Sequence, residues 1–496
     1  MKMKKMKETA CKEKPDQKQI PRILIAATGS GSGKTAISAG LLRLLTRRQM
    51  SVHACKCGPD YIDPMFHETV LGVASDNLDS YFATEDEING ILYSAPETHA
   101  VIEGVMGLYD GIHVSTLAGS CYEIAAMSKT PVLLVVDAKG SGRTILSVLK
   151  GILQDDEKHL IRGILFNRMS EGFYEKCRPA VEEMLQDGGF SQVRCLGAIP
   201  SVAGIGFESR HLGLKLPDEI EDICGKIDRM SNVLEEHCDI DALLAIMEAA
   251  PAIPAGVVRE SEDTEVHSDG AAQSLSHGDF AVGTGAARPV LAVAKDEAFC
   301  FYYRRNLELL KDLGVSIRTF SPLHDTQLPP DAAGLYLGGG YPELHLEKLS
   351  ANTSMLQSIR KALSEGMPSI AECGGFIYLH RTVLDREGRP FELVGAIEGS
   401  CQDTGHPVRF GYVEVAKKDV CAFSKSLAGM RGHEFHYFDS TASPDVAVKK
   451  PVTGQEWSAL IADENRLWGF PHFYFPSAPD VMRGFVSAIR TNFLKN

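Results

Sequence analysis

The chain has 496 residues, of which 44% are hydrophobic, and its 51 Lys and Arg against 65 Asp and Glu give a net charge of −14. This length predicts two to four domains with buried cores, at about 100–200 residues each. The acidic balance argues against nucleic-acid binding, which depends on clustered cations, and no apolar run reaches the ~18–20 residues of a membrane helix. The 12 cysteines have no framework spacing and follow no secretory signal. We therefore expect reduced thiols in a cytoplasmic protein.

The first half of the chain shows the pattern of a layered α/β domain. Residues 1–20 carry seven lysines and almost nothing to bury, which predicts a disordered tail. In residues 21–245 a short apolar strand is followed by a Gly/Ser turn and by a helix with apolar residues at i, i+4 and i+7. Helical stretches then alternate with further buried strands. These strands are predicted at residues 23–27, 51–55, 100–103, 131–137 and 163–167.

The second half predicts another α/β domain. Residues 246–288 are rich in Ala, Gly, Ser, Pro, Asp and Glu without periodicity, as is typical of a linker. Residues 289–496 then open with a buried strand at 290–294. Further strands are expected at 333–337, 367–371 and 458–462, the last followed by a turn at 463–466.

A phosphate-binding loop is predicted between the first strand and its helix, where the sequence reads Thr-Gly-Ser-Gly-Ser-Gly-Lys-Thr from Thr28 to Thr35. Glycines allow backbone N–H groups to converge on phosphate oxygens at a helix N-terminus. In this pattern the lysine neutralises phosphates and the following hydroxyl binds Mg²⁺. Thr28 stands where the pattern has glycine, but the strand and helix are correctly placed. The predicted ATP-binding residues here are Gly29, Gly31, Gly33, Lys34 and Thr35.

Acidic side chains follow two neighbouring strands of the same predicted sheet. Asp60 follows the second strand and Glu103 ends the third. Ligands of open α/β sheets bind beyond the carboxyl ends of strands. Together with Thr35, both carboxylates are therefore candidate Mg²⁺ ligands. Asn167, which ends the strand at 163–167, is a candidate for docking the nucleotide base. Cys55 and Cys57 have no second Cys or His pair at zinc spacing.

A cysteine in the second half has the setting of a nucleophile. Cys373 follows an apolar strand and precedes two glycines and a helical segment, a tight turn that projects a reactive atom above the sheet. Backbone N–H groups of Gly339 and Gly340, after another strand, and of Gly374 are candidate oxyanion donors. The general base must be a histidine. The candidates are His433, His436 and His472, and the residues alone do not choose among them.

The chain resembles the cobyrinate a,c-diamide synthases, a family of ATP-dependent, glutamine-using enzymes of corrin biosynthesis. The resemblance runs from residue 21 to the end, except for the linker. The first half is similar to P-loop amidoligases related to dethiobiotin synthetase, and the second to class I glutamine amidotransferases. This implies two α/β domains, a P-loop NTPase domain followed by a flavodoxin-like domain. The matching segments are residues 56–67, 103–111, 210–214, 296–302, 371–375 and 432–437.

The resemblance also implies an activity. Cys373 releases ammonia from L-glutamine, and ATP phosphorylates a corrin carboxylate of cobyrinate that the ammonia then converts to an amide. In this family the histidine near the C-terminus is the base, which here is His472. A Glu two residues later completes a triad in related class I enzymes, but this chain has Tyr474 there. The implied neighbours of ATP, metal and substrate carboxylate are Asp60, Tyr61, Asp63, Glu103 and Asp110.

Three other functions are compatible with parts of this pattern. Diamidation of nickel-sirohydrochlorin in coenzyme F430 biosynthesis would use the same architecture, and local motifs barely separate the two tetrapyrroles. Cobyric acid synthase fits less well, because residues 56–67 resemble the a,c-diamide branch. A partition-type ATPase switch with an inert second half would not need Cys373 in its strand–turn–helix setting. A homodimer is compatible with the sequence.

Overall fold

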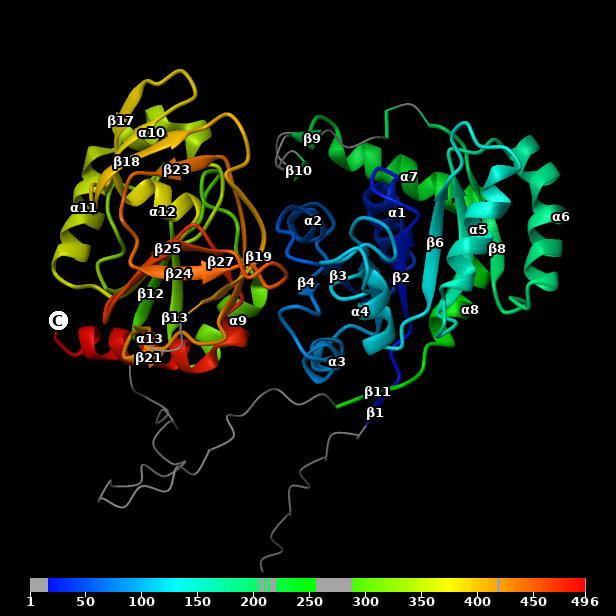
Figure 1. Ribbon diagram of the computed structural model, residues 1–496, viewed down its shortest axis with the longest axis horizontal. Helices are drawn as coiled ribbons and strands as arrows, with labels where there is room; N and C mark the ends of the chain where they lie inside the picture. Colours follow the sequence, from blue (N-terminus) through cyan, green and yellow to red (C-terminus); the bar gives the residue numbers. More distant parts are fainter. Residues whose placement is uncertain are drawn as a thin grey trace, which may run out of the picture. The chain divides into compact units, whose positions relative to one another are not determined.

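The computed structural model describes residues 17–202, 204–205, 209–210, 213–214, 220–255, 288–416 and 420–495 (Figure 1). They divide into two compact units: the first holds the described residues of 17–80 and 84–255, and the second those of 81–83 and 288–495. Each unit is built on a sheet with helices packed against it, so the predicted pair of α/β domains is confirmed. In the described part of the chain, no helix combines the length and apolar character needed to cross a bilayer.

The first unit contains a parallel seven-stranded sheet of order β4-β3-β5-β2-β6-β7-β8. The second strand ends later than predicted, at Cys57 rather than residue 55, so that Lys56 lies within it opposite Glu103. The strands are β2 (Arg22–Ala27), β3 (Val52–Cys57), β4 (Ser75–Leu78), β5 (His99–Glu103), β6 (Val132–Asp137), β7 (Ile161–Asn167) and β8 (Arg194–Ile199).

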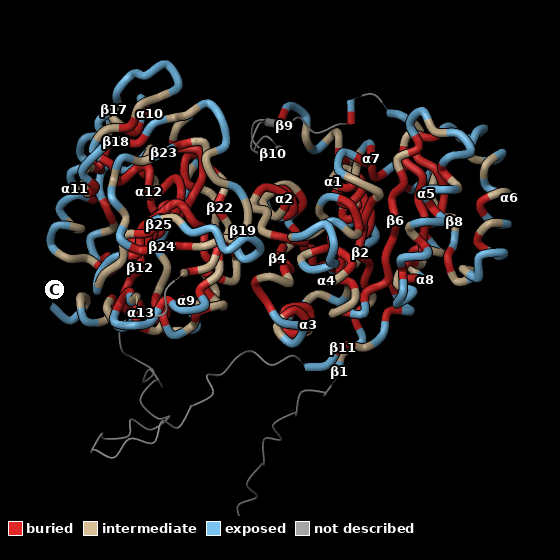
Figure 2. Tube along the Cα trace, viewed as in Figure 1, coloured by how far each residue is buried: buried red, intermediate tan, exposed pale blue. Residues whose placement is uncertain are grey.

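Both faces of this sheet are covered, as Figure 2 shows by the buried course of its central strands. Ile23 and Ile25 pack with α1, α7 and α8, while the intervening Leu24 is also fully buried. Such burial is usual for parallel sheets and leaves only the strand ends for chemistry. The helices of the unit are α1 (Lys34–Arg47), α2 (Ile62–Met65), the π-helix η1 (Phe66–Val70), α3 (Glu85–Ser94), α4 (Cys121–Met127), α5 (Thr144–Gln154), α6 (Glu171–Asp187), α7 (Ile223–His237) and α8 (Ile240–Glu248).

Two short strands lie within stretches that the sequence analysis assigned to the tail and the linker. β1 (Gln17–Lys18) pairs antiparallel with β11 (Ile253–Pro254). The Lys18 ammonium also donates a hydrogen bond to the Ala95 carbonyl at 2.7 Å. Residues 17–18 and 253–254 therefore belong to the folded first unit. A second small pair joins β9 (Ser209–Arg210) and β10 (Gly213–Leu214).

The second unit contains a ten-stranded mixed sheet of order β13-β12-β14-β15-β26-β25-β24-β19-β22-β27. Its first five strands are parallel and the remaining pairings are antiparallel. The strands are β12 (Val290–Ala294), β13 (Ser316–Phe320), β14 (Ala332–Leu337), β15 (Ser369–Glu372), β19 (Arg409–Val415), β22 (Arg431–His436), β24 (Val446–Lys449), β25 (Glu456–Ala462), β26 (Arg466–Gly469) and β27 (His472–Phe473).

Helices and a second sheet complete this unit. The four-stranded sheet has the order β17-β16-β18-β23, with β16 (His380–Leu384), β17 (Pro390–Glu392), β18 (Ile397–Asp403) and β23 (Phe438–Ser440). A short hairpin joins β20 (Cys421–Ala422) and β21 (Lys425–Ser426). The helices are α9 (Arg304–Asp312), the 3₁₀ turns η3 (Pro342–His345) and η4 (Phe475–Ser477), α10 (Leu346–Ala351), α11 (Thr353–Ser364), α12 (Gly374–Leu379) and α13 (Pro479–Phe493).

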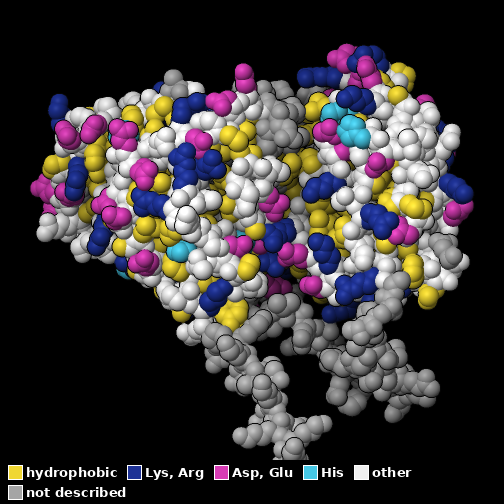
Figure 3. Space-filling view, turned by 180° about the vertical axis from the view of Figure 1, so that it is seen from behind, with side chains coloured by type: hydrophobic (Ala, Val, Ile, Leu, Met, Phe, Trp, Pro, Cys, Tyr) yellow, Lys and Arg dark blue, Asp and Glu magenta, His cyan; other side chains and the backbone are white. Residues whose placement is uncertain are grey.

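The surfaces of the units carry both signs of charge. On the face seen in Figure 3, Lys and Arg side chains are interspersed with Asp and Glu side chains over each unit. This mixed pattern accompanies the acidic net charge of −14.

Candidate functional site

The predicted phosphate loop joins β2 to α1 at the carboxyl edge of the first sheet. Gly33 has a left-handed backbone (φ 93°), and a Cβ there would lie 2.4 Å from the Asn167 amide nitrogen, so only glycine fits. That amide donates to the Ser32 carbonyl at 2.8 Å, while the Ser32 hydroxyl donates to the Gly29 carbonyl at 2.8 Å. The loop is therefore held by its own side chains and by the end of β7. Asn167 lies against this loop, and its role toward a base stays a prediction.

Lys34 begins α1 with its ammonium turned back over the loop. It donates to the carbonyls of Gly29, at 3.3 Å, and of Met106. Burial, and then the charge of Lys56, lower the pKa of Lys34. Lys34 is buried, and its hydrogen bonds within the described residues go to carbonyl oxygens, so this cation gains when phosphate oxygens replace them. The position suits the predicted role.

Glu103 is the centre of a buried polar cluster beside this loop. Its Oε1 accepts hydrogen bonds from the Thr35 hydroxyl at 2.7 Å and the Lys56 ammonium at 3.0 Å, and Oε2 lies 3.5 Å from His67 Nε2. Burial by itself would raise the pKa of Glu103, but Lys56, His67 and Thr35 hold it well below its usual value. His67 is oriented by a hydrogen bond between its Nδ1 and the Ser75 hydroxyl, at 2.9 Å. The carboxylate is thus kept ionised inside the protein.

The oxygens of Thr35 and Glu103 fit a magnesium ion that is also held by nucleotide phosphates. Both are hard ligand oxygens, they lie 2.7 Å apart, and Glu103 Oε2 is buried with His67 Nε2, at 3.5 Å, as its neighbour and accepts no closer hydrogen bond from the described residues. Within the described residues, no three His, Cys, Asp or Glu side chains are arranged to hold a metal without such help. Mg²⁺ bound here would neutralise phosphate charge.

The other predicted acidic residues occupy different environments. Asp60 is half-buried, and its Oδ1 accepts the backbone N–H groups of Ile62, at 2.8 Å, and Asp63, at 3.1 Å. Asp63 is buried in an ion pair with Lys56; burial, and then Glu103, raise the pKa of Asp63. Tyr61 is half-buried, and the exposed Asp110 accepts the Gly107 N–H at 2.8 Å. Asp60 and Asp63 thus border the Glu103 cluster.

Lys56 and His67 received no role in the sequence analysis, although both lie in the quoted segment 56–67. Each is less than 5% exposed and contacts Glu103. Burial would lower the pKa of Lys56, but Asp63 and Glu103 raise it well above its ordinary value. Lys56 lies near the end of β3 and Glu103 ends β5, the neighbouring strand in the sheet. A lysine and a glutamate at the ends of two buried strands are the sequence signal that could have predicted this ion pair.

The second candidate centre is the turn at Cys373, between β15 and α12. The cysteine has φ 45° and ψ −101°, a strained conformation for a non-glycine residue that is typical of nucleophile turns. Its N–H donates to the Gly469 carbonyl at 2.9 Å. Burial, and then the carboxylates of Glu343 and Glu434, raise the pKa of Cys373, against a hydrogen bond from the Gly374 N–H. The thiol therefore needs a base to become a nucleophile.

The glycines predicted to bind an oxyanion lie together beside this thiol. A Cβ on Gly374 would lie 3.1 Å from the Gly340 nitrogen, and a Cβ on Gly340 only 2.1 Å from the Ala298 carbonyl oxygen. A Cβ on Gly339 would lie 2.2 Å from the His472 Cε1. These approaches require glycine and place the two turns against each other. The loop also packs directly on the predicted base.

His472 begins β27, where it lies opposite His433 of β22. Burial, with smaller contributions from His433 and His436, lowers the pKa of His472 to about 3. A neutral imidazole can accept the thiol proton. Burial also lowers the pKa of His433 to about 4, and His436 Nε2 hydrogen-bonds Glu434 at 3.0 Å. His472 packs on the predicted oxyanion loop through its close approach to Gly339.

The backbone of β27 is clamped by two buried side chains that the sequence analysis did not identify. Glu372 Oε1 accepts the Phe473 N–H at 2.9 Å, and Glu372 Oε2 accepts the Tyr336 hydroxyl at 2.7 Å. The Asn306 amide donates to the Phe473 carbonyl at 2.7 Å and accepts the Phe475 N–H at 2.8 Å. Glu372 precedes Cys373, the predicted nucleophile, and Phe473 follows His472, the predicted base. The clamp therefore connects the segments that carry these two candidate groups.

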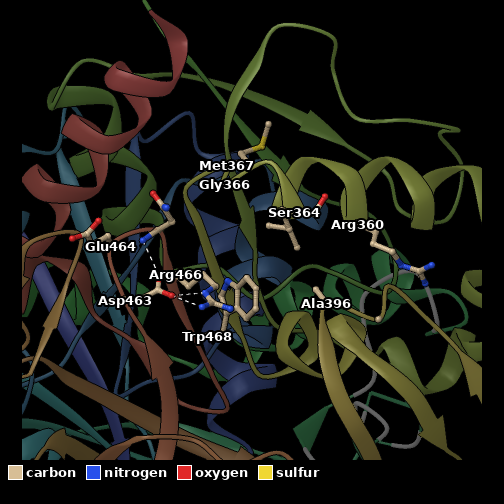
Figure 4. A pocket seen from close by; sticks show the side chains of 12 residues that line it. Arg360, Ser364, Gly366, Met367, Ala396, Asp463, Glu464, Arg466 and Trp468 are labelled. Atoms are coloured by element: carbon tan, nitrogen blue, oxygen red, sulfur yellow. Dashed lines mark hydrogen bonds and ion pairs between the residues drawn. The ribbon is translucent and has the colours of Figure 1, made fainter. Parts of the chain in front are cut away.

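A separate cavity of about 660 Å³ lies in the second unit, beside the amino ends of β15 and β26, whereas Cys373 follows the carboxyl end of β15 (Figure 4). It is lined by residues at the amino ends of β15 and β26 and by the end of α11, among them Arg360, Asp463, Arg466 and Trp468. Arg466 is held by an ion pair with Asp463. None of the predicted site residues lines this cavity.

Comparison with known proteins places both units in families. Residues 23–212 match the CobQ/CobB/MinD/ParA nucleotide binding domain, and residues 290–473 match the CobB/CobQ-like glutamine amidotransferase domain. The chain is 34% identical to the cobyrinate a,c-diamide synthase of Listeria innocua over 93% of this chain and 98% of the relative. It is also 35% identical to the cobyrinate a,c-diamide synthase of Salmonella typhimurium and 34% identical to that of Picrophilus torridus. Each of these matches covers 94% of this chain and 98% of the relative.

The fold and the two centres define a ligase that joins a nucleotide-binding P-loop domain to a glutamine amidotransferase domain. With more than 30% identity over nearly the whole length of these relatives, the chain belongs to the cobyrinate a,c-diamide synthase family.

Proposed function

We propose that the protein amidates the a and c carboxylates of cobyrinate in cobalamin biosynthesis, using ATP and L-glutamine. The observation that carries the proposal is the presence in one chain of two candidate centres, the Lys34–Thr35–Glu103 phosphate site and the Cys373 turn with Gly339 packed on His472. The names of its relatives supply the substrate. Neither centre alone would make an amide from glutamine.

In the second unit, Cys373 supplies the nucleophile. His472 takes the thiol proton, the sulfur attacks the glutamine carboxamide carbon, and the proton passes to the leaving nitrogen, so that ammonia departs. The N–H groups of Gly340 and Gly374 stabilise the oxyanion. Water then cleaves the thioester to glutamate, with His472 again moving the proton. Glu372 and Asn306 act as positioning residues that hold the strand of the base.

In the first unit, ATP transfers its γ-phosphoryl group to a substrate carboxylate, forming an acyl phosphate and ADP. Lys34 stabilises charge on the transferred group, and Gly29, Gly31 and Gly33 shape the loop around the phosphates. Ammonia attacks the carbonyl carbon and phosphate leaves. Two rounds use two ATP and two glutamine and produce the diamide.

Other residues of the first unit surround the reacting groups. Mg²⁺ held by Thr35 and Glu103, with Asp60 nearby, neutralises phosphate charge when bound. Asp60, Tyr61, Asp63 and Asp110 face the substrate carboxylate, and Asn167 the nucleotide base. We propose a cytoplasmic enzyme that acts on small molecules and not on nucleic acid. Its amidoligase domain is residues 21–245, extended by the rest of α8 and by the β1–β11 pair, and its amidotransferase domain is residues 289–496. Light scattering tests whether it forms a homodimer.

The decisive experiment supplies the purified chain with cobyrinate, ATP, Mg²⁺ and glutamine, and weighs the product. Each amidation converts one carboxyl group to a carboxamide, so the mass should change in two steps, to the monoamide and then to the diamide. One ADP should form per amide. A parallel reaction offers nickel-sirohydrochlorin. Preferential amidation of the nickel tetrapyrrole, or ADP formation without amide, would contradict the proposal.

A further inference from the structure

Glu434 is a buried carboxylate whose hydrogen bonding is incomplete. On β22, Gly432, Glu434 and His436 are buried, while the residues between them are half-buried. Glu434 is 1% exposed, and its Oε1 hydrogen-bonds His436 Nε2 at 3.0 Å. Its Oε2 is buried and has no hydrogen-bond partner within the described structure. An unsatisfied oxygen of this kind carries a desolvation cost unless a ligand satisfies it.

The neighbours of Glu434 place it at the cysteine turn. The His436 ring stacks on Phe470, with centroids 3.9 Å apart and an interplanar angle of 6°. Phe470 follows Gly469, whose carbonyl accepts the Cys373 N–H. The backbone of Glu434 is one residue along β22 from His433, which lies opposite His472, so the Glu434 side chain points to the face that it shares with His436 and not to that of His433. The charge of Glu434 also acts on the Cys373 thiol, whose pKa it helps to raise.

The chemistry of the proposed substrate supplies the missing partner. Glutamine carries an α-ammonium group with three donors, a few bonds from the carboxamide that Cys373 attacks. A buried carboxylate oxygen forms its strongest hydrogen bonds with such a cation. We propose that Glu434 Oε2 binds the α-ammonium of glutamine while His436 holds Oε1, so that Glu434 selects glutamine over amides that lack the amino group. This assignment rests on the proposed role of Cys373 as the glutaminase nucleophile.

Glu343 is the matched comparison. It is a glutamate whose charge also raises the pKa of Cys373, but it is half-buried, on the turn η3. If only negative charge near the thiol affected hydrolysis, neutralising Glu343 or Glu434 would change the preference for glutamine by the same amount. The assignment requires that only Glu434 distinguishes substrates by their amino group.

The test measures hydrolysis of glutamine and of 4-carbamoylbutanoate, which has the same carboxamide and carboxylate but no amino group. In the unsubstituted chain kcat/KM should favour glutamine by at least about 100-fold, because a site built to bind a substrate N–H group rejects the analogue that lacks it. Glu434→Gln should reduce this preference to a few fold, mainly through a loss on glutamine. Glu343→Gln should keep it. Ammonium-dependent amidation by each variant reports an intact chain.

Several results would overturn the assignment. If Glu434→Gln lowered kcat/KM equally for both amides, Glu434 would be a structural residue. If Glu343→Gln lost the preference for glutamine, the α-ammonium would be bound by Glu343 instead. Should Glu434→Gln not fold, calorimetry on Cys373→Ala gives a second measurement: glutamine should bind at least 10-fold more tightly than 4-carbamoylbutanoate, and equal binding refutes the proposal. An unsubstituted chain that amidates with ammonium but hydrolyses no glutamine would instead refute the proposed function.

Discussion

Glu372→Gln should change how the stability of the second unit depends on pH. Burial raises the pKa of Glu372 from 4.5 to about 7, although Phe473 and Tyr336 donate hydrogen bonds to it. The folded protein therefore keeps this proton to a higher pH than the unfolded chain does. The resulting stability is fully present below pH 4.5 and is lost as the pH rises through 7. At 1.36 kcal/mol per pKa unit, the loss is about 3 kcal/mol.

Glutamine has nearly the shape of the protonated carboxyl group and cannot ionise; its carbonyl oxygen can accept the Phe473 N–H while its NH2 group donates to the Tyr336 oxygen, as a protonated Oε2 would. The Glu372→Gln chain should therefore lack this loss, and its stability relative to the unsubstituted chain should rise by about 2 to 3 kcal/mol between pH 5 and pH 8. The chain has two tryptophans, Trp457 and Trp468, and both lie in the second unit. Urea unfolding followed by their fluorescence therefore reports this unit within the full chain.

The control is Glu456→Gln, which neutralises an exposed carboxyl group on β25. It should follow the unsubstituted chain at every pH. Parallel curves for Glu372→Gln and the unsubstituted chain would refute the reasoning, because they would mean that the buried carboxyl group holds no extra proton. Glu372→Ala should lower the free energy of unfolding at all pH values, because it leaves the buried Phe473 N–H without its acceptor, at a cost of about 1–3 kcal/mol.

The remaining predictions separate the two centres. Cys373→Ala should lose glutamine-dependent amidation and keep amidation from ammonium salts; loss of both in a folded chain would refute the division into two sites. Lys34→Ala should abolish amidation from either nitrogen source, measured as ADP and amide, while basal glutamine hydrolysis persists; normal ATP-dependent amidation would remove Lys34 from the mechanism. His472→Ala should slow glutamine hydrolysis by about 10²–10⁴-fold and spare ammonium-dependent synthesis. His433→Ala, on the facing strand, should affect hydrolysis less, and the opposite order would change the assignment of the base.

Local sequence patterns predicted the parts of this protein whose structure depends on near neighbours. The alternation of apolar runs and glycine turns identified β2, α1 and the phosphate loop between them, since a P-loop is one strand, one turn and one helix in succession. The same holds for Cys373, whose turn lies between β15 and α12. Lysines in the first 20 residues predicted a tail, but residues 17–18 form β1 because they pair with β11. Local patterns could not show this, since β11 lies more than 230 residues away in the sequence.

Contacts between distant segments could be found only in the folded chain. Lys56 and Glu103 are 47 residues apart, and their ion pair exists because β3 and β5 are neighbours in the sheet. Glu372 reaches the Phe473 N–H across 101 residues, through the pairing of β15 with β26. The sequence by itself determined which reactive groups exist and which local turns present them, because periodicity and glycine placement act over a few residues. The tertiary structure decided which groups meet, how far their pKa values shift and which buried oxygen is left for a ligand, because these depend on the strand order of the sheet and on the exclusion of water.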